Sequence, residues 1–311
     1  MTAQSPGAGR GAREVLAVRF GQRVTSRAES YLNFHLYGEP DAALDIDYFF
    51  WVIREPGGAV TLVDTGFAPE VGDRRRRAHW ATPAEALPGL GIAPDDVATV
   101  VISHAHWDHT GNLGQFPGAA VVMAEAEYDF WTSPVAARTQ FAAHAESAEI
   151  ALLARARADG RLTLFRGQHT LAPGVELIEL GGHTPGQLIA TVSTGPVPAG
   201  PMPAGPMPAG PMPAGPVPAG TGAAGAGTAV LASDALHFYE EVERDRPFAI
   251  LADLPAMYRA YDTLAQLASE PGTHLVAGHD PAVRARFEPW SPPSGADGGL
   301  QVADLGRPVS G

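Results

Sequence analysis

Thr-Val-Val-Ile-Ser-His-Ala-His-Trp-Asp-His-Thr-Gly-Asn-Leu, residues 99–113, is the stretch on which the interpretation of the whole chain depends. The apolar run 97–102 predicts a buried strand that stops at Ser103. Three histidines and an aspartate come within the next six residues. Crowded imidazoles and carboxylates repel one another or lose hydration unless a cation lies between them, so this cluster predicts a divalent metal ion. An isolated His-x-His is typical of a polar loop, whereas the full His-x-His-x-Asp-His after a strand is not. The four metal-binding candidates in this stretch are His104, His106, Asp108 and His109.

The spacing of this motif suits two ions. His104 and His106 are two residues apart, so in an extended turn both can point to the same side. Asp108 and His109 follow where the chain starts a helix, so they can hold a second ion beside the first. Neutral imidazole and carboxylate suit zinc, manganese, iron or cobalt. The chain has no cysteine, which excludes thiolate ligands and disulfides.

Composition excludes several classes of partner. The chain has 21 basic and 34 acidic residues, a net charge of −13, which argues against a nucleic-acid partner or an anionic membrane surface. The first residues contain no apolar signal-peptide core, and no apolar run is long enough to span a bilayer. We therefore expect a cytoplasmic protein whose partner is a small-molecule substrate.

The pattern along the chain predicts one domain with one large insertion. Residues 13–289 carry the strand and helix patterns, while residues 1–12 and 290–311 are rich in small residues, Gly or Pro and are expected to be disordered. Five tandem copies of Pro-x-Pro-Ala-Gly begin at residue 196. With the Gly/Ala-rich residues after them they form an insertion at 196–227, which cannot build a core and is also expected to be disordered. Strand-like runs on both sides indicate a lengthened hairpin loop.

Three more candidate ligands follow predicted strands. His183 lies among glycines in the turn 181–186, Asp234 follows the strand 228–232, and His279 follows the strand 274–277. Side chains at strand ends on one edge of a sheet commonly build sites. Five imidazoles and two carboxylates are about what two ions need, with Asp234 as a bridge. The predicted metal ligands are His104, His106, Asp108, His109, His183, Asp234 and His279.

Other features carry weaker expectations. Asp64 ends a strand and is interpreted either as a turn former or as a carboxylate that accepts the second N–H of a ligand histidine. Apolar residues from Phe141 to Leu152 repeat at helical spacing and predict a long helix that starts near 132 and ends at 159–160, with His144 on its surface. The aromatic segment 31–50 is a candidate wall for a substrate pocket.

Four motifs in this order resemble the metallo-β-lactamase superfamily. They are Ser-His-Ala-His-Trp-Asp-His-Thr-Gly from 103, Gly-Gly-His-Thr-Pro-Gly from 181, Ser-Asp-Ala from 233 and Gly-His-Asp from 278. The resemblance covers about residues 14–289 and implies an α+β fold, an αββα sandwich of two mixed sheets with helices outside. The stretch from Asp47, the Thr-Pro-Gly-Gln-Leu after His183 and the Ser-Asp-Ala-Leu-His-Phe stretch resemble its N-acyl-homoserine lactonase branch.

The resemblance implies roles for these residues. His104, His106 and His183 would hold one divalent ion, with Zn²⁺ the expected metal. Asp108, His109 and His279 would hold the other, and Asp234 would bridge the two. A hydroxide shared by the two ions would attack the lactone carbonyl, and Asp108 would carry the proton to the ring oxygen. Better-known lactonases have a catalytic tyrosine three residues after the bridging aspartate; this chain has His237 there, either as a hydrogen-bond donor to the substrate or as a structural histidine.

Two alternatives remain beside lactone hydrolysis. A hydrolase of the same fold could act on another ester, a thioester or a β-lactam. The chain could also be a non-catalytic interaction protein that binds a partner through the Pro-x-Pro-Ala-Gly array and has a hydrolase fold without activity. Inactive members of enzyme folds usually lose metal ligands, and none of the expected ligands is missing here. A helical C-terminal domain of the glyoxalase II kind is not expected, because too little sequence follows His279.

Overall fold

Strands that are apolar on both faces form the centre of the fold. In β1 (Glu14–Ser26), Leu16 and Val18 face the helices on one side, while Val15 and Ala17 face the other sheet. Strands buried on both faces are expected where a sheet is covered on each side. The structure, a computed structural model, describes residues 12–195, 227–292 and 300–309. The expected disordered segments 1–12 and 196–227 lie outside the described residues, apart from their last residues.

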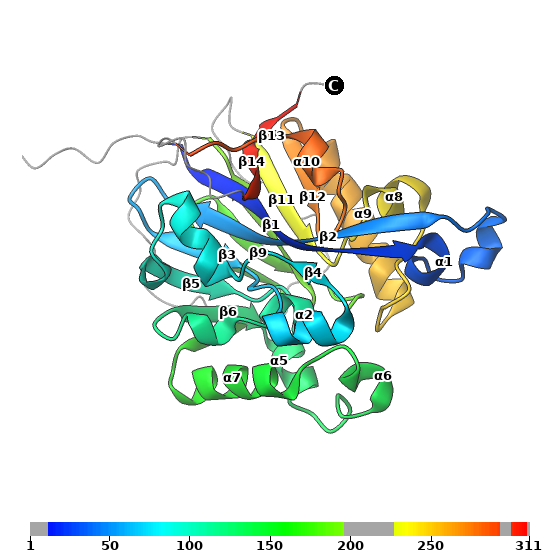
Figure 1. Ribbon diagram of the computed structural model, residues 1–311, viewed down its shortest axis with the longest axis horizontal. Helices are drawn as coiled ribbons and strands as arrows, with labels where there is room; N and C mark the ends of the chain where they lie inside the picture. The colour runs from blue at the N-terminus through cyan, green and yellow to red at the C-terminus, as the bar shows by residue number, and fades with distance from the viewer. Residues whose placement is uncertain (1–11, 196–226, 293–299, 310–311) are drawn as a thin grey trace, which may run out of the picture.

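Two sheets pack face to face with helices on their outer sides (Figure 1), as predicted for an αββα sandwich. The larger sheet has the order β13 (Phe287–Pro289), β14 (Gln301–Pro308), β1, β2 (Ala43–Arg54), β3 (Val60–Val63), β5 (Val97–Val101), β6 (Ala120–Ala124) and β7 (Leu162–Phe165), with β4 (Ala78–His79) beside β1. The smaller sheet has the order β12 (Thr273–Ala277), β11 (Thr228–Ser233), β10 (Leu188–Ser193), β9 (Val175–Glu179) and β8 (Gln168–Ala172).

The helices cover the two outer faces. Buried residues of α2, α5 and α7 pack on the larger sheet, and those of α8, α9 and α10 pack on the side of the smaller sheet (Figure 1). None of the helices in the described ranges is long and apolar enough to cross a membrane. The helices are α1 (Arg27–Ser30), α2 (Pro69–Arg75), α3 (Pro83–Ala86), α4 (Trp107–Thr110), α5 (Glu125–Trp131), α6 (Thr139–Ala142), α7 (Ser147–Ala158), α8 (Tyr239–Arg244), α9 (Leu254–Ser269) and α10 (Val283–Arg286).

The insertion joins two neighbouring antiparallel strands, as the hairpin prediction required. Ser193 at the end of β10 pairs with Thr228 at the start of β11. The Thr194 amide donates to the Gly227 carbonyl at 2.9 Å, which continues the ladder to the edge of the described residues. The chain therefore leaves and re-enters the sheet at one place.

Two expectations about the fold were wrong. The predicted long helix is divided into α6 and α7, because residues 143–146 bend and the His144 carbonyl accepts from the Trp107 amide at 2.9 Å. The predicted disordered tail 290–311 contains β14, which pairs antiparallel with β1. Its Leu305 is 1% exposed. The partner of this strand is almost 300 residues away in sequence, so the pairing gives no local signal. The Gly and Pro residues around the short strand instead favoured a prediction of disorder.

The tail strand yields a stability prediction. Leu305→Ala should lower the free energy of unfolding by about 2–5 kcal/mol, because it removes a buried side chain and leaves a cavity. Arg307→Ala, on the exposed part of the same strand, should change it by less than about 0.5 kcal/mol. Urea unfolding measures both, and equal effects of the two variants would contradict a folded role for β14.

Candidate metal centre

The central motif lies where β5 ends and α4 begins. The segment from Ser103 to His106 is an irregular connection, and Trp107–Thr110 form one helical turn, so Asp108 and His109 lie on α4. β5 is parallel to its neighbour β3, which places the end of β3 beside the motif. An acidic residue in a first helical turn is favourable, since backbone N–H groups there are unpaired.

The other three candidates arrive from the smaller sheet. His183 follows β9 through Gly181 and Gly182, whose φ angles of 70° and 96° favour glycine. A Cβ on Gly182 would lie 2.8 Å from the Met257 backbone, so the close approach of α9 requires glycine here. Asp234 and His279 follow the parallel strands β11 and β12, whose carboxyl ends lie at one edge. The structure thus brings all seven predicted residues to one place.

Asp234 lies between two groups of ligand atoms. Those of Asp234, His104, His106 and His183 all lie within 4.8 Å of one another, as do those of Asp108, His109 and His279. Asp234 Oδ2 is 3.3 Å from His183 Nε2 and 3.7 Å from His104 Nε2. Asp234 Oδ1 is 3.2 Å from His109 Nε2 and 3.0 Å from His279 Nε2. One carboxylate therefore faces both groups.

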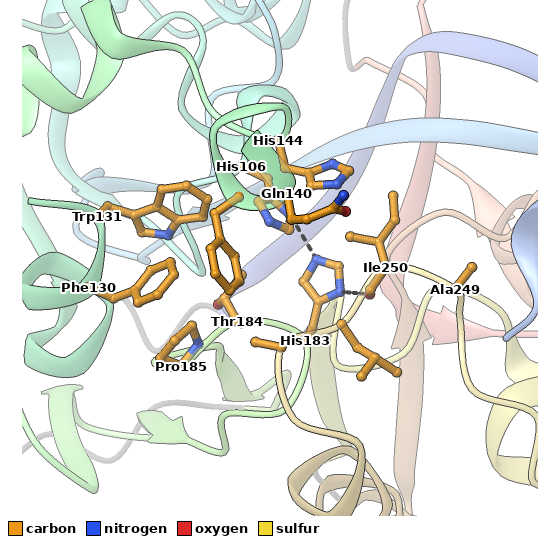
Figure 2. Close-up of a pocket in the computed structure, with 13 residues that line it drawn as sticks. His106, Phe130, Trp131, Gln140, His144, His183, Thr184, Pro185, Ala249 and Ile250 are labelled. Atoms are coloured by element: carbon orange, nitrogen blue, oxygen red, sulfur yellow. Dashed lines mark hydrogen bonds between the residues drawn. The ribbon is translucent and has the colours of Figure 1, made fainter. Parts of the chain in front are cut away.

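The chemistry of this cluster fits divalent cations. Among the described residues, His104 Nε2, His109 Nε2 and Asp234 Oδ1 are buried without a hydrogen-bond partner. Burial lowers the pKa of His104, His106 and His183 well below the usual value, so the rings are neutral and each keeps one nitrogen lone pair. His183 Nε2 and His106 Nδ1 lie 2.8 Å apart and share a hydrogen bond (Figure 2). Neutral imidazole and carboxylate are the donors that zinc and related ions bind.

Several rings are anchored through their Nδ1 atoms, so that Nε2 faces the cluster. Nδ1 of His183 is 2.8 Å from the Ile250 carbonyl, and Nδ1 of His279 is 2.9 Å from the Asp47 carbonyl. Nδ1 of His109 is 2.7 Å from Asp64 Oδ2. Such contacts fix the tautomer and orientation of a metal-binding histidine.

Asp64 has both roles considered for it. Its φ of 64° is in the left-handed region, as in a turn, and its carboxylate faces His109. The same carboxylate accepts from the Ser103 amide at 2.8 Å and the Ser103 hydroxyl at 2.7 Å. Asp64 thus connects the end of β3 to both the connection after β5 and the ring of His109.

Sequence reasoning missed Glu127, which joins the two ligand loops. Its buried carboxylate accepts from the amides of Ala105 at 2.8 Å and Gly186 at 2.9 Å and from Trp131 Nε1 at 2.6 Å. A Cβ on Gly186 would lie 2.3 Å from the Glu127 amide nitrogen, so only glycine allows this approach. The alternating Ala and Glu residues at the start of α5 resemble an exposed helix and give no signal of this role.

His237 also lies at the cluster. Its ring is 1% exposed, and its Nε2 is 3.1 Å from Asp234 Oδ2 without a well-oriented hydrogen bond in the described part of the chain. Its Nδ1 faces Glu241 Oε1 at 3.3 Å. Burial opposes protonation of the ring, but the carboxylates of Asp234 and Glu241 outweigh it and raise the pKa of His237 to about 10. The ring is thus placed as a donor.

A pocket of about 370 Å³ opens beside His106 and His183 (Figure 2). In Figure 2, Phe130 and Trp131 form an aromatic wall, and Ile250 lies across from it. Phe141 also lines the pocket, with its ring centroid 4.9 Å from that of Phe130. Apart from histidine, no acidic or basic side chain is among the described residues that line it.

The expectation that His144 lies on the helix surface was wrong, and the candidate wall at 31–50 is not part of this pocket. His144 is half-buried in the pocket wall, 5.5 Å from the His106 ring, because the bend between α6 and α7 turns it inward. The aromatic segment 31–50 contributes none of the lining residues. Its Tyr31 is buried against Phe34 and Phe238 instead.

Comparison with known proteins gives one family and several relatives. Residues 48–198 match the profile of the Metallo-beta-lactamase superfamily. The N-acyl homoserine lactonase AttM of Rhizobium radiobacter is 35% identical over 107 residues, which are 30% of this chain and only 40% of that protein.

Solved structures share the fold. An N-acyl homoserine lactone hydrolase with the product N-hexanoyl-L-homoserine bound at its catalytic metal center has a TM-score of 0.65 at 18% identity, covering 89% of this chain and 97% of that one. AidC, a dizinc quorum-quenching lactonase, has a TM-score of 0.60 at 18% identity, covering 87% of this chain and 88% of that one.

The position of Glu127 yields a prediction. Glu127→Ala should lower the free energy of unfolding by at least about 3 kcal/mol, because it leaves three buried N–H donors without an acceptor. Glu125→Ala, on the same helix and paired only with the exposed Arg166, should cost at most about 1 kcal/mol. Equal losses in urea unfolding would contradict the proposed connection between the ligand loops.

Proposed function

The chain carries a metallo-β-lactamase superfamily domain, and from this premise we propose that it is a metal-dependent hydrolase that opens the ring of N-acyl-homoserine lactones. The observation that carries the proposal is the position of Asp234, whose two oxygens face two separate groups of ligand atoms. A shared carboxylate between two such groups is the arrangement expected for paired ions.

The proposed ligands divide accordingly. His104, His106 and His183 would hold one ion, Asp108, His109 and His279 the other, and Asp234 both. Divalent ions bound there, which we propose are Zn²⁺, supply Lewis acidity and a nucleophile derived from water at neutral pH. The dizinc lactonase of the same fold supports this choice of metal.

Asp108 is the proposed proton carrier. Its side chain is 12% exposed, whereas that of Asp234 is 4% exposed, so Asp108 is the carboxylate with better access to a substrate. As the water oxygen bonds to the carbonyl carbon, Asp108 would take the released proton and deliver it to the ring oxygen when the C–O bond breaks. The product is the open-chain acyl homoserine.

His237 is the proposed donor to the developing oxyanion. Its Nε2 is buried beside Asp234 and has no hydrogen-bond partner among the described residues, so an N–H there is available to a carbonyl oxygen. Such a preorganised donor stabilises charge that develops in the transition state.

The pocket supports a small, uncharged acylated substrate. Its wall is aromatic and aliphatic, and burial keeps the rings of His106, His144 and His183 neutral by lowering their pKa. An acyl chain and a neutral lactone can be buried there without leaving a charge unpaired. A polyanion would meet no arginine or lysine in the described lining.

Metal analysis and a substrate panel test the proposed function together. Protein purified without chelator should contain about two divalent ions per chain and open N-acyl-homoserine lactones, and chelation should remove the activity. Opening releases a carboxylic acid, so a pH indicator measures it. A metal-free active protein would contradict the proposal. A two-ion protein inert on lactones but active on lactoylglutathione or nitrocefin would transfer the assignment to thioesters or β-lactams.

Asp64 provides a separate test of the ligand set. Asp64→Asn should weaken metal affinity by about 10–100-fold, because the His109 ring loses the carboxylate that orients it. Asp73→Asn is the matched control: this exposed carboxylate also contacts a histidine, His79, at 3.1 Å, but outside the cluster. Competition with a chromophoric chelator measures both, and an unchanged affinity for Asp64→Asn would contradict a role of His109 as ligand.

A further inference from the structure

We propose that Glu241 is a positioning residue that fixes the ring of His237 at the Asp234 side of the cluster. The inference rests on the proposed function, because it concerns the donor assigned to the substrate carbonyl. It assigns a role to a buried carboxylate that no motif in the sequence indicates.

A chain of buried contacts leads from the cluster to α9. His237 Nε2 is 3.1 Å from Asp234 Oδ2, and His237 Nδ1 is 3.3 Å and 3.5 Å from the two oxygens of Glu241. The Tyr261 hydroxyl donates to Glu241 Oε2 at 2.8 Å. Every member of this chain is at most 5% exposed, so water does not compete for these contacts.

The orientation of the His237 ring is set from two directions. Phe248 stacks on its face at 3.9 Å between ring centroids and 16° between planes, which fixes the plane of the ring. A stacked ring can still flip by 180° about its Cβ–Cγ bond, which would put Cδ2 and Cε1 where Nδ1 and Nε2 now lie. Glu241 selects one of these orientations, because a carboxylate only accepts and so requires an N–H at Nδ1. Nε2 is thereby directed toward Asp234.

The charge of Glu241 is not needed for its other contacts. The Phe238 amide donates to Oε1 at 2.9 Å and the Tyr261 hydroxyl to Oε2 at 2.8 Å. In a glutamine the carbonyl oxygen could accept from the amide, and the amide group could donate to the oxygen of the Tyr261 hydroxyl, which both donates and accepts. A buried carboxylate costs far more desolvation free energy than an amide. Only the contact with the His237 ring specifically requires an acceptor-only group here, which argues against a purely structural glutamate.

The neighbouring α8 carboxylate serves as a control. Glu243 is on the same helix, is 56% exposed at its side chain and pairs with Arg286 at 3.0 Å, away from His237. Glu243→Gln therefore makes the same chemical change on α8 without touching the chain of buried contacts.

The experiment compares Glu241→Gln, Glu243→Gln, His237→Gln and the double variant His237→Gln/Glu241→Gln as metal-loaded enzymes. Glu241→Gln should lower kcat by about 10-fold or more with KM within about 2-fold, since it disorients a donor without altering the pocket. Glu243→Gln should match the wild type. The double variant should be no slower than His237→Gln alone, because Glu241 acts only through that ring.

A second measurement does not depend on activity. ¹⁵N–¹H NMR of the histidine rings, in metal-free and metal-loaded protein, should show a proton on Nδ1 of His237, identified by its absence in His237→Gln. In Glu241→Gln this signal should shift or disappear. A wild-type ring without an Nδ1 proton, or additive losses of kcat in the double variant, would overturn the proposal.

The two measurements keep the hypotheses separate. A wild type that opens no lactone would fail the proposed function, while the NMR result would still decide whether Glu241 orients His237. If Glu241→Gln does not fold, the wild-type signal decides by itself: an Nδ1 proton shifted downfield by a hydrogen bond and protected from exchange supports the contact with Glu241, and one without these properties overturns the proposal.

Discussion

The arrangement of this structure depends on the contacts between one buried carboxylate, that of Asp234, and the imidazole rings around it. Asp234 has the nitrogens of His109, His183, His237 and His279 within 3.3 Å of its two oxygens, and the rings come from both sheets. Charges at such distances in a poorly hydrated interior interact strongly, and lone pairs left facing one another are unfavourable. Assembly of this edge and occupation by cations are therefore expected to be thermodynamically coupled.

The structure meets that condition by anchoring several rings through the nitrogen that faces away from the cluster. Backbone carbonyls hold His183 and His279, and Asp64 holds His109. Glu127 connects the loops that carry the rings. The groups that do this come from segments far apart in sequence, so the precision of the site depends on the packing of the whole sandwich and not on the central motif alone.

The sequence made the ligand set predictable because its signals are local. A run of apolar residues followed by His-x-His-x-Asp-His specifies both a strand end and a donor set, and His183, Asp234 and His279 repeat that placement. Glu127 and Glu241 gave no such signal, since a glutamate in a short helix usually faces solvent and only a partner distant in the chain reveals otherwise. The predictions for His144 and β14 were wrong for the same reason, because each depends on a partner distant in the chain. The helix is interrupted at His144, whose carbonyl accepts from the Trp107 amide, and β14 is a strand because it pairs with β1.

The hairpin of β10 and β11 keeps the proposed metal ligands at one end of its strands and the repeat insertion at the other. His183 precedes β10 and Asp234 follows β11, whereas residues 196–226 are inserted at the opposite end of the same two strands, which are six residues long each. Six residues of strand correspond to about 20 Å. A change in the number of Pro-x-Pro-Ala-Gly repeats therefore takes place a full strand length away from the metal ligands. For the same reason, this position is suited to the insertion of a reporter or an affinity tag.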